Sequence, residues 1–129
     1  MMQVTNDGDS QAIGHMVCWR VNGATPAQRR QQCQDIVALF EALRGSVGGL
    51  QCMQVGCNTV EHADAWDVLV YMVFDSQLTL SAYMDSSAHQ NIKCQVGPMR
   101  ASRGQADILL SGCMSAEIEQ AHEAAVSHV

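Results

Sequence analysis

Alternation of apolar and polar side chains predicts β-strands in four parts of the chain. In residues 13–21, "IGHMVCWRV", the side-chain pattern repeats with a period of two. This is the period of a β-strand, in which successive side chains point to opposite faces. Runs rich in apolar and β-branched residues predict three further strands, at residues 50–58, 66–74 and 103–110. The polar residues 59–65 between the second and third strands predict a hairpin connection.

A long helix is predicted after the first strand by its start signal and its apolar spacing. Thr25 is a favourable N-cap, Pro26 suits the first helical position, and Gln28 completes a capping box with Thr25. Apolar residues then recur at three- and four-residue steps, as on a helix face packed against a sheet: Cys33, Ile36, Val37, Phe40 and Leu43. The glycines of "GSVGG" end this pattern.

A second helical region is predicted in two pieces between the third and fourth strands. Asp75 or Ser76 can cap the first piece, "SQLTLSAYM". Ser87 and Gln90 have the spacing of a capping box that starts the second piece, "AHQNIKCQV". The Gly-Pro pair that follows should end the helix, because proline cannot continue its hydrogen bonding.

The predicted order is β-α-β-β-α-β, the ferredoxin-like arrangement of the α+β class with a four-stranded antiparallel sheet. Two helices cover one face of such a sheet, so the other face needs a different cover. The third strand is apolar on both sides, with Val68, Val70 and Met72 on one face and Leu69, Tyr71 and Val73 on the other. We therefore expect a homodimer that pairs through the sheet face, giving a dimeric α/β barrel.

Length and composition are those of a single folded domain. The chain has 129 residues, of which 47% are hydrophobic and 16% are charged. The polar, aperiodic residues 1–12 predict a disordered N-terminal lead, and residues 13–110 contain the predicted strands and helices. Residues 111–129, rich in Ala and Glu, predict a C-terminal helical extension.

Charge and hydropathy argue against several classes of partner. The net charge is −6, but the tails carry much of it, and residues 11–110 are close to neutral. One Lys and six scattered Arg do not provide a phosphate-binding cluster, so no nucleic acid is expected. No apolar run approaches the roughly 20 residues that cross a bilayer, so no membrane partner is expected either. The first ten residues lack the features of an export signal, which favours a cytoplasmic location.

The sequence contains no local motif for a metal or a cofactor. Six cysteines occur without a C-x-x-C motif, and reduced thiols that serve partly as small core residues are expected at Cys18, Cys33, Cys52, Cys57, Cys94 and Cys113. Cys and His residues also lack the local spacing of a zinc site. The P-loop, G-x-G-x-x-G, G-x-S-x-G and H-E-x-x-H motifs are absent, so neither a metal nor an organic cofactor is expected.

Three segments in succession, "GHMVCWRV", "GGLQCMQVGCN" and "WDVLVYMVFDSQLTLSAYMDSSAHQNI", resemble a known family. They are similar to the first, second and third strands, with the second helix, of the stress-responsive A/B barrel (Dabb) family. The resemblance covers about residues 14–110. It implies the ferredoxin-like fold and a dimeric barrel, and it is less specific for an activity.

The same resemblance implies a candidate site at Tyr83 and His89. One family member performs an aldol cyclisation of a polyketide thioester without a cofactor, using the Tyr and the second His of Y-x-x-H-P-x-H. Tyr83 and His89 match these two positions, whereas Ser86 and Ser87 replace the first His and the Pro. His15 matches a family position that lies near the same pocket.

Two hypotheses about function remain open. The first, favoured by the altered motif, is a nonenzymatic or small-ligand-binding homodimer in which the Tyr83 hydroxyl lies at the rim and a backbone group satisfies His89. A loop carbonyl would then satisfy His15.

The second hypothesis is a cofactor-independent cyclase or isomerase acting on an apolar, polyketide-like carbonyl compound. His89 would be its base and Tyr83 the donor to the enolate oxygen, with His15 as a third polar group. Side chains six residues apart do not lie on the same face of one helix, so the second hypothesis needs a break in the helix at residues 85–87.

Overall fold

The computed structural model describes residues 11–111, which include all the strands and helices predicted within the domain. In chain order the elements are β1 (Ile13–Val21), α2 (Pro26–Glu41), β2 (Leu50–Cys57), β3 (Val68–Phe74), α3 (Gln77–Met84), α4 (Ser87–Val96), the 3-10 turn η1 (Gly97–Met99) and β4 (Arg100–Leu109). The expected disordered lead and C-terminal helical extension lie, apart from residues 11, 12 and 111, outside the described residues.

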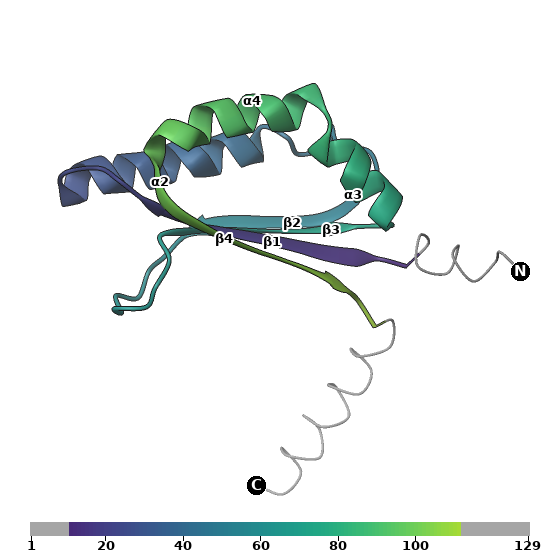
Figure 1. Cartoon of the computed structure of the whole chain (residues 1–129), viewed down its shortest axis with the longest axis horizontal. Helices are drawn as coiled ribbons and strands as arrows, with labels where there is room; N and C mark the ends of the chain where they lie inside the picture. Colours follow the sequence, from purple (N-terminus) through teal and green to yellow (C-terminus); the bar gives the residue numbers. More distant parts are fainter. Residues whose placement is uncertain (1–10, 112–129) are drawn as a thin grey trace, which may run out of the picture.

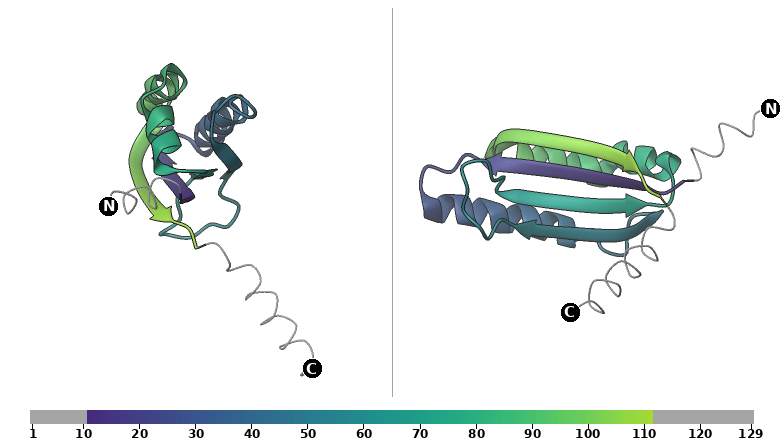
Figure 2. Two further views of the ribbon diagram at one scale, coloured as in Figure 1. Left: turned by 90° about the vertical axis from the view of Figure 1, so that its right-hand side faces the viewer. Right: turned by 90° about the horizontal axis from the view of Figure 1, so that it is seen from below.

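The four strands form one antiparallel sheet in the order β2-β3-β1-β4. Figures 1 and 2 show α2, α3 and α4 on one face of this sheet. The predicted ferredoxin-like α+β fold is therefore confirmed. Strand β4 begins at Arg100, three residues before its predicted start, because Ser102 and Arg100 still pair with Arg20 and Val21 at the end of β1.

Helix α2 begins as predicted. Thr25 caps the helix, its side chain accepts a hydrogen bond from the Gln28 N–H, and the Gln28 side chain accepts from the Thr25 N–H in return.

The hydrophobic core lies between α2, α3, α4 and the face of the sheet that these helices cover. It includes one side of β3 and the inner faces of the helices, with Val68, Val70, Met72, Phe74, Ile36, Phe40, Leu80, Ile92 and Val96 all buried.

The opposite face of the sheet is largely apolar and is not covered by any helix within residues 11–111. Met16 and Leu69 are each 37% exposed, and Ile108 on the edge strand β4 is 56% exposed. At one end of this face the Arg20 guanidinium lies 4.4 Å from the centre of the Trp66 ring, in a cation–π contact. We call this surface the open face.

The described cysteines are free thiols, but they contribute less to the core than the sequence suggests. Cys33 on α2 is the buried one among them, whereas Cys52 is exposed. The expectation that Cys52 serves as a core residue is wrong for the single chain. Pairing with Val73 directs Cys52 to the open face instead.

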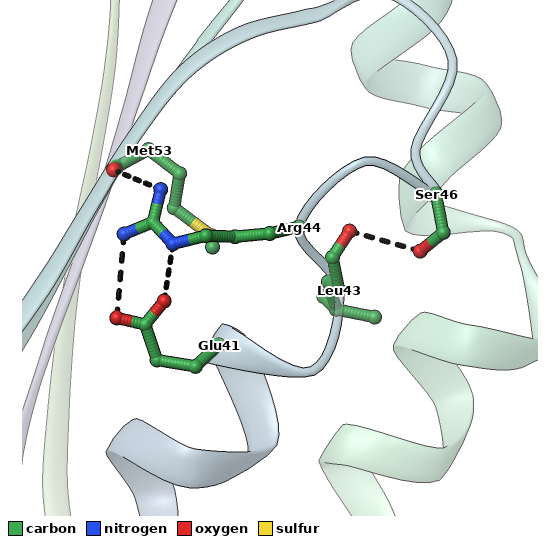
Figure 3. Close-up of polar contacts among 5 residues, drawn as sticks. All are labelled: Glu41, Leu43, Arg44, Ser46 and Met53. Carbon is green, nitrogen blue, oxygen red and sulfur yellow. Dashed lines mark hydrogen bonds and ion pairs between the residues drawn. The ribbon is translucent and has the colours of Figure 1, made fainter.

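The connection from α2 to β2 is held by polar contacts around Arg44 (Figure 3). The Arg44 guanidinium pairs with the Glu41 carboxylate and also donates to the backbone carbonyl of Met53, at 3.0 Å. Ser46 donates from its hydroxyl to the carbonyl of Leu43, at 2.8 Å. The Ser46 bond satisfies a carbonyl just beyond the end of α2, and Arg44 connects that end of the helix to the edge strand β2.

Gly49, at the end of this connection, lies in close contact with α3. Its φ of 81° lies in the left-handed region, and a Cβ there would approach the Thr79 side chain to 2.5 Å. Thr79 lies in the first turn of α3, the helix that carries Tyr83. Gly45 also has a positive φ, of 78°, but a Cβ there would meet nothing within 4 Å.

Among residues 11–111, none of the helices combines the length and the apolar character that crossing a membrane requires.

Substitution of these two glycines should separate backbone strain from crowding. Gly45→Ala should lower the free energy of unfolding by about 1–2 kcal/mol, the cost of a left-handed conformation for a residue with a Cβ. Gly49→Ala should cost about 1–3 kcal/mol more, because the new methyl group also displaces Thr79 and α3. Urea unfolding of both variants and the wild type measures the difference. Equal losses would contradict the close contact between Gly49 and α3.

Candidate active site

A cavity of about 290 Å³ lies between the covered face of the sheet and the helices. Its apolar wall comes from β1, β3, α2 and α4, and includes Val17, Trp19, Phe40, Val70 and Ile92. The three site residues predicted from the sequence, His15, Tyr83 and His89, all line this one cavity. The structure thus brings together side chains that are as far apart in sequence as 15 and 89.

The break between α3 and α4 places Tyr83 and His89 in contact. Helix α3 ends at Met84 and α4 begins at Ser87. The two ring centroids are 5.0 Å apart, and the planes are inclined at 61°, which is an edge-to-face arrangement. The interruption that the second hypothesis requires at residues 85–87 is therefore present.

Ser86 holds this junction and caps α4. Its hydroxyl oxygen accepts from the backbone N–H of His89, at 3.2 Å, and its O–H donates to the Tyr83 carbonyl, at 2.6 Å. The predicted capping box of Ser87 and Gln90 is wrong. Ser86 has the extended backbone of an N-cap, so Ser87 becomes the first helical residue.

Tyr83 is buried and presents an unsatisfied hydroxyl group. The residue is 4% exposed, and its hydroxyl oxygen has no hydrogen-bond partner among residues 11–111. The expectation of a hydroxyl at the rim is therefore wrong, because the ring also packs against Phe74 in the core, at 5.5 Å between centroids. Burial raises the pKa of Tyr83 to about 12, so the group is a neutral hydrogen-bond donor at neutral pH.

His89 is buried in the first turn of α4 with one ring nitrogen engaged. Its Nδ1–H donates to the carbonyl oxygen of Met84, at 2.9 Å. This hydrogen bond to the backbone agrees with the first hypothesis, and it also leaves Nε2 as the unprotonated nitrogen of the neutral ring. Burial lowers the pKa of His89, and the positive charge of Lys93 lowers it further, so the neutral form prevails at neutral pH.

His15 is held by a carboxylate and not by the expected loop carbonyl. Its Nδ1 lies 2.5 Å from Oδ1 of Asp107, and the histidine is 2% exposed. The two residues face each other because β1 and β4 pair His15 with Asp107. A carboxylate on Nδ1 fixes the tautomer in which Nε2 is the hydrogen-bond acceptor.

Asp107 is the functional candidate that the sequence analysis missed. It lies 92 residues from His15, and only the register of two strands brings them together. Its other oxygen accepts from the Gln105 side chain, at 2.9 Å, and Gln105 in turn accepts from Arg103, at 2.7 Å. Alternation within the predicted fourth strand puts these three polar side chains on one face, a signal that was visible in the sequence.

No cluster of three or more His, Cys, Asp or Glu side chains that could hold a metal ion occurs within residues 11–111. The side chains of His15, Tyr83 and His89 can support acid/base chemistry. Two imidazoles and one phenol surround a mainly apolar space, where a small ligand would be shielded from water.

A family comparison identifies the domain. The model of the stress responsive A/B barrel domain matches residues 13–109, which is most of the chain. A search of proteins with curated descriptions found no match.

Solved structures of similar fold come from several organisms. A dimeric ferredoxin-like protein of unknown function from Thermobifida fusca has a TM-score of 0.68 and 22% identity, and the match covers 78% of this chain and 92% of that one. A hydroxynitrile lyase from Passiflora edulis has a TM-score of 0.66 and 13% identity, covering 79% and 95%. A Dabb family protein from Mesorhizobium loti has a TM-score of 0.65 and 14% identity, covering 79% and 99%. At these identities the likeness concerns the fold.

The two neighbouring serines provide a matched test of the junction. Ser86→Ala should lower the free energy of unfolding by about 1 kcal/mol, because the N–H of His89 loses its cap. Ser87→Ala should change it by less than about 0.5 kcal/mol, because this position is the first helical residue and no N-cap. Urea unfolding of both variants checks the order. A larger loss in Ser87→Ala would contradict the capping geometry.

Proposed function

The chain belongs to the stress-responsive A/B barrel domain family, and from this premise we propose that it is a homodimer whose cavity binds a small, largely apolar carbonyl compound. We further propose that it moves a proton at the carbon next to the carbonyl group, without a cofactor. The observation that carries this proposal is the buried Tyr83 hydroxyl, which has no partner within residues 11–111 and lines the same cavity as His15 and His89. The proposed functional unit is the domain at residues 13–110.

The proposed reaction begins with His89 as the base. Nε2 of the neutral ring takes a proton from the carbon next to the carbonyl, and the electron pair of that C–H bond forms the enolate. The Tyr83 hydroxyl donates a hydrogen bond to the enolate oxygen, where the negative charge develops. A buried phenol that stays protonated suits this role, since its pKa is raised to about 12.

The His15–Asp107 pair supports a second proton-transfer role in the same cavity. Asp107 holds the imidazole, and its negative charge offsets the positive charge that forms when Nε2 takes up a proton. If the substrate carries a carbon–carbon double bond next to the deprotonated carbon, a dienolate forms, and its protonation at a different carbon completes an isomerisation. Attack of the enolate carbon on a second carbonyl of the same molecule instead forms a ring, as in an aldol cyclisation.

Binding without turnover is the second candidate function. The presence of Ser86 and Ser87 in place of the His-Pro pair of the family motif favours it. The Nδ1 bond from His89 to the Met84 carbonyl is also what a purely structural histidine would form. Both candidates use the same cavity, and the rate of proton transfer distinguishes them.

The proposed dimer would bury the open face. Met16, Leu69 and Ile108 expose apolar surface on adjacent strands, and a second copy of the same sheet is the simplest cover. Several proteins of similar fold are themselves described as dimeric. Because the cavity lies on the other side of the sheet, each subunit would hold its own site.

Deuterium exchange tests the proposed proton transfer without knowledge of the natural substrate. The protein should accelerate exchange next to the carbonyl of 2-octanone in D₂O, followed by NMR. His89→Gln should slow the exchange about 10²- to 10⁴-fold, and Tyr83→Phe about 10²- to 10³-fold. Because the base must be neutral, the rate should fall as the pH falls through the pKa of His89, which lies below 6.5.

His62→Gln is the matched control for this experiment, since its side chain is 69% exposed in the loop between β2 and β3. It should retain the wild-type rate. Exchange that is no faster with the wild type than with His89→Gln would refute proton transfer. Ketone-dependent NMR shifts of cavity residues would then identify a binding protein.

Replacement of Leu69 by a charged residue tests the dimer. Leu69→Glu should convert the dimer to a monomer, because two carboxylates would be buried at the symmetric interface. Leu78→Glu is the control, because Leu78 is 71% exposed on α3, on the other side of the sheet. Light scattering after size-exclusion chromatography measures the mass. A wild-type monomer would contradict this part of the proposal.

A further inference from the structure

Three cationic side chains line the cavity that holds Tyr83 and the two histidines. Lys93 comes from α4, and Arg100 and Arg103 come from β4. They lie between residues 93 and 103 of the sequence, and the fold places all three at one cavity. They are three of the seven Lys and Arg residues in a chain whose net charge is −6. The cavity is therefore lined by positive charge although the chain as a whole is negative.

These cations are not neutralised by ion pairs within residues 11–111. Among the Lys and Arg residues in that range, Arg44 forms an ion pair with Glu41, and neither of these two lines the cavity. Lys93, Arg100 and Arg103 form no ion pair there. Arg103 donates to the neutral amide of Gln105. The acidic side chain that lines this strand face, Asp107, is already engaged by His15 and Gln105.

All three residues are exposed, so the cluster leaves an excess of positive charge where the cavity opens to solvent. Burial lowers the pKa of Arg103, the nearby charge of Arg100 lowers it further, and the negative charge of Asp107 opposes both in part. Lys93 and Arg103 also act on His89 and favour its neutral form. A guanidinium that forms no ion pair favours binding of an anion, because it can donate two parallel hydrogen bonds to a carboxylate or a phosphate.

We propose that the ligand of this cavity carries an anionic group, such as a carboxylate, bound by Arg103 with Arg100 and Lys93 while its carbonyl end lies at Tyr83 and His89. This inference rests on the proposed function and specifies its substrate class as amphipathic: an apolar carbonyl compound with an anion at one end. The cations would select it over neutral compounds of the same shape.

The spacing of the residues sets the length of such a ligand. His89 and Lys93 are four residues apart on α4, or about 6 Å along the helix axis. Asp107 and Arg103 are four residues apart on β4, or about 13 Å along the strand. The anion should therefore be separated from the reactive carbonyl by a chain of several atoms, which excludes short 2-oxo acids.

Two matched probes test this inference with the full-length protein. The compounds are 7-oxooctanoate and its methyl ester, which share the ketone and the chain but differ in charge. The carboxylate should bind at least about 10-fold more tightly than the ester, as measured by NMR titration. Arg103→Ala should reduce this preference to less than about 3-fold and leave the Kd of the ester unchanged. Arg30→Ala, an exposed arginine of α2 that does not line the cavity, should keep the preference.

Salt provides a measurement that does not depend on any variant folding. Raising the NaCl concentration from about 0.05 to 0.5 M should weaken binding of the carboxylate severalfold and leave the ester unaffected, because salt screens the attraction. Equal Kd values for acid and ester, or equal losses of both in Arg103→Ala, would overturn the anion site while binding of an apolar carbonyl compound stands. If neither compound binds, both proposals fail.

Discussion

Each strand directs alternate side chains to opposite faces of the sheet, and the helices within residues 11–111 cover one of those faces. This constraint divides β1 into two sets of residues with different tasks. His15 and Val17 face the helices and line the cavity, whereas Met16 lies on the open face. A shift of one residue in the pairing of β1 would exchange the two sets. Register therefore controls both the candidate active site and the candidate interface.

The fold could be predicted because its signals are local. Alternation along β1 gave the bounds Ile13–Val21, and the capping box at Thr25 gave the start of α2, both as found. Errors arose where local signals compete. Both Ser86 and Ser87 are suitable caps, and the end of α3 decides between them through the hydrogen bond from Ser86 to Tyr83. The earlier start of β4 depends on its register with β1, which the sequence of β4 alone does not reveal.

The candidate site was predictable only in part. Tyr83 and His89 were found through a family resemblance, and the need for a break between them followed from helix geometry. The partner of His15 could not be found in this way, because it depends on the pairing of strands from distant parts of the chain. The place of Lys93 and Arg103 at the cavity could not be found either, because the cavity forms only in the folded chain. The sequence shows these charges near one another in the chain, and the fold shows that they line the same cavity as Tyr83 and His89. The fold therefore adds information about ligand charge that composition does not contain.

The orphan hydroxyl of Tyr83 connects folding to binding. A buried donor without a partner typically destabilises a folded protein by about 1–3 kcal/mol relative to one that is satisfied. A carbonyl ligand that accepts this hydrogen bond would offset that cost, so the hydroxyl would contribute to the affinity for the ligand. The same group that lowers the stability of the fold would thus favour a bound carbonyl compound over an apolar compound that lacks a hydrogen-bond acceptor.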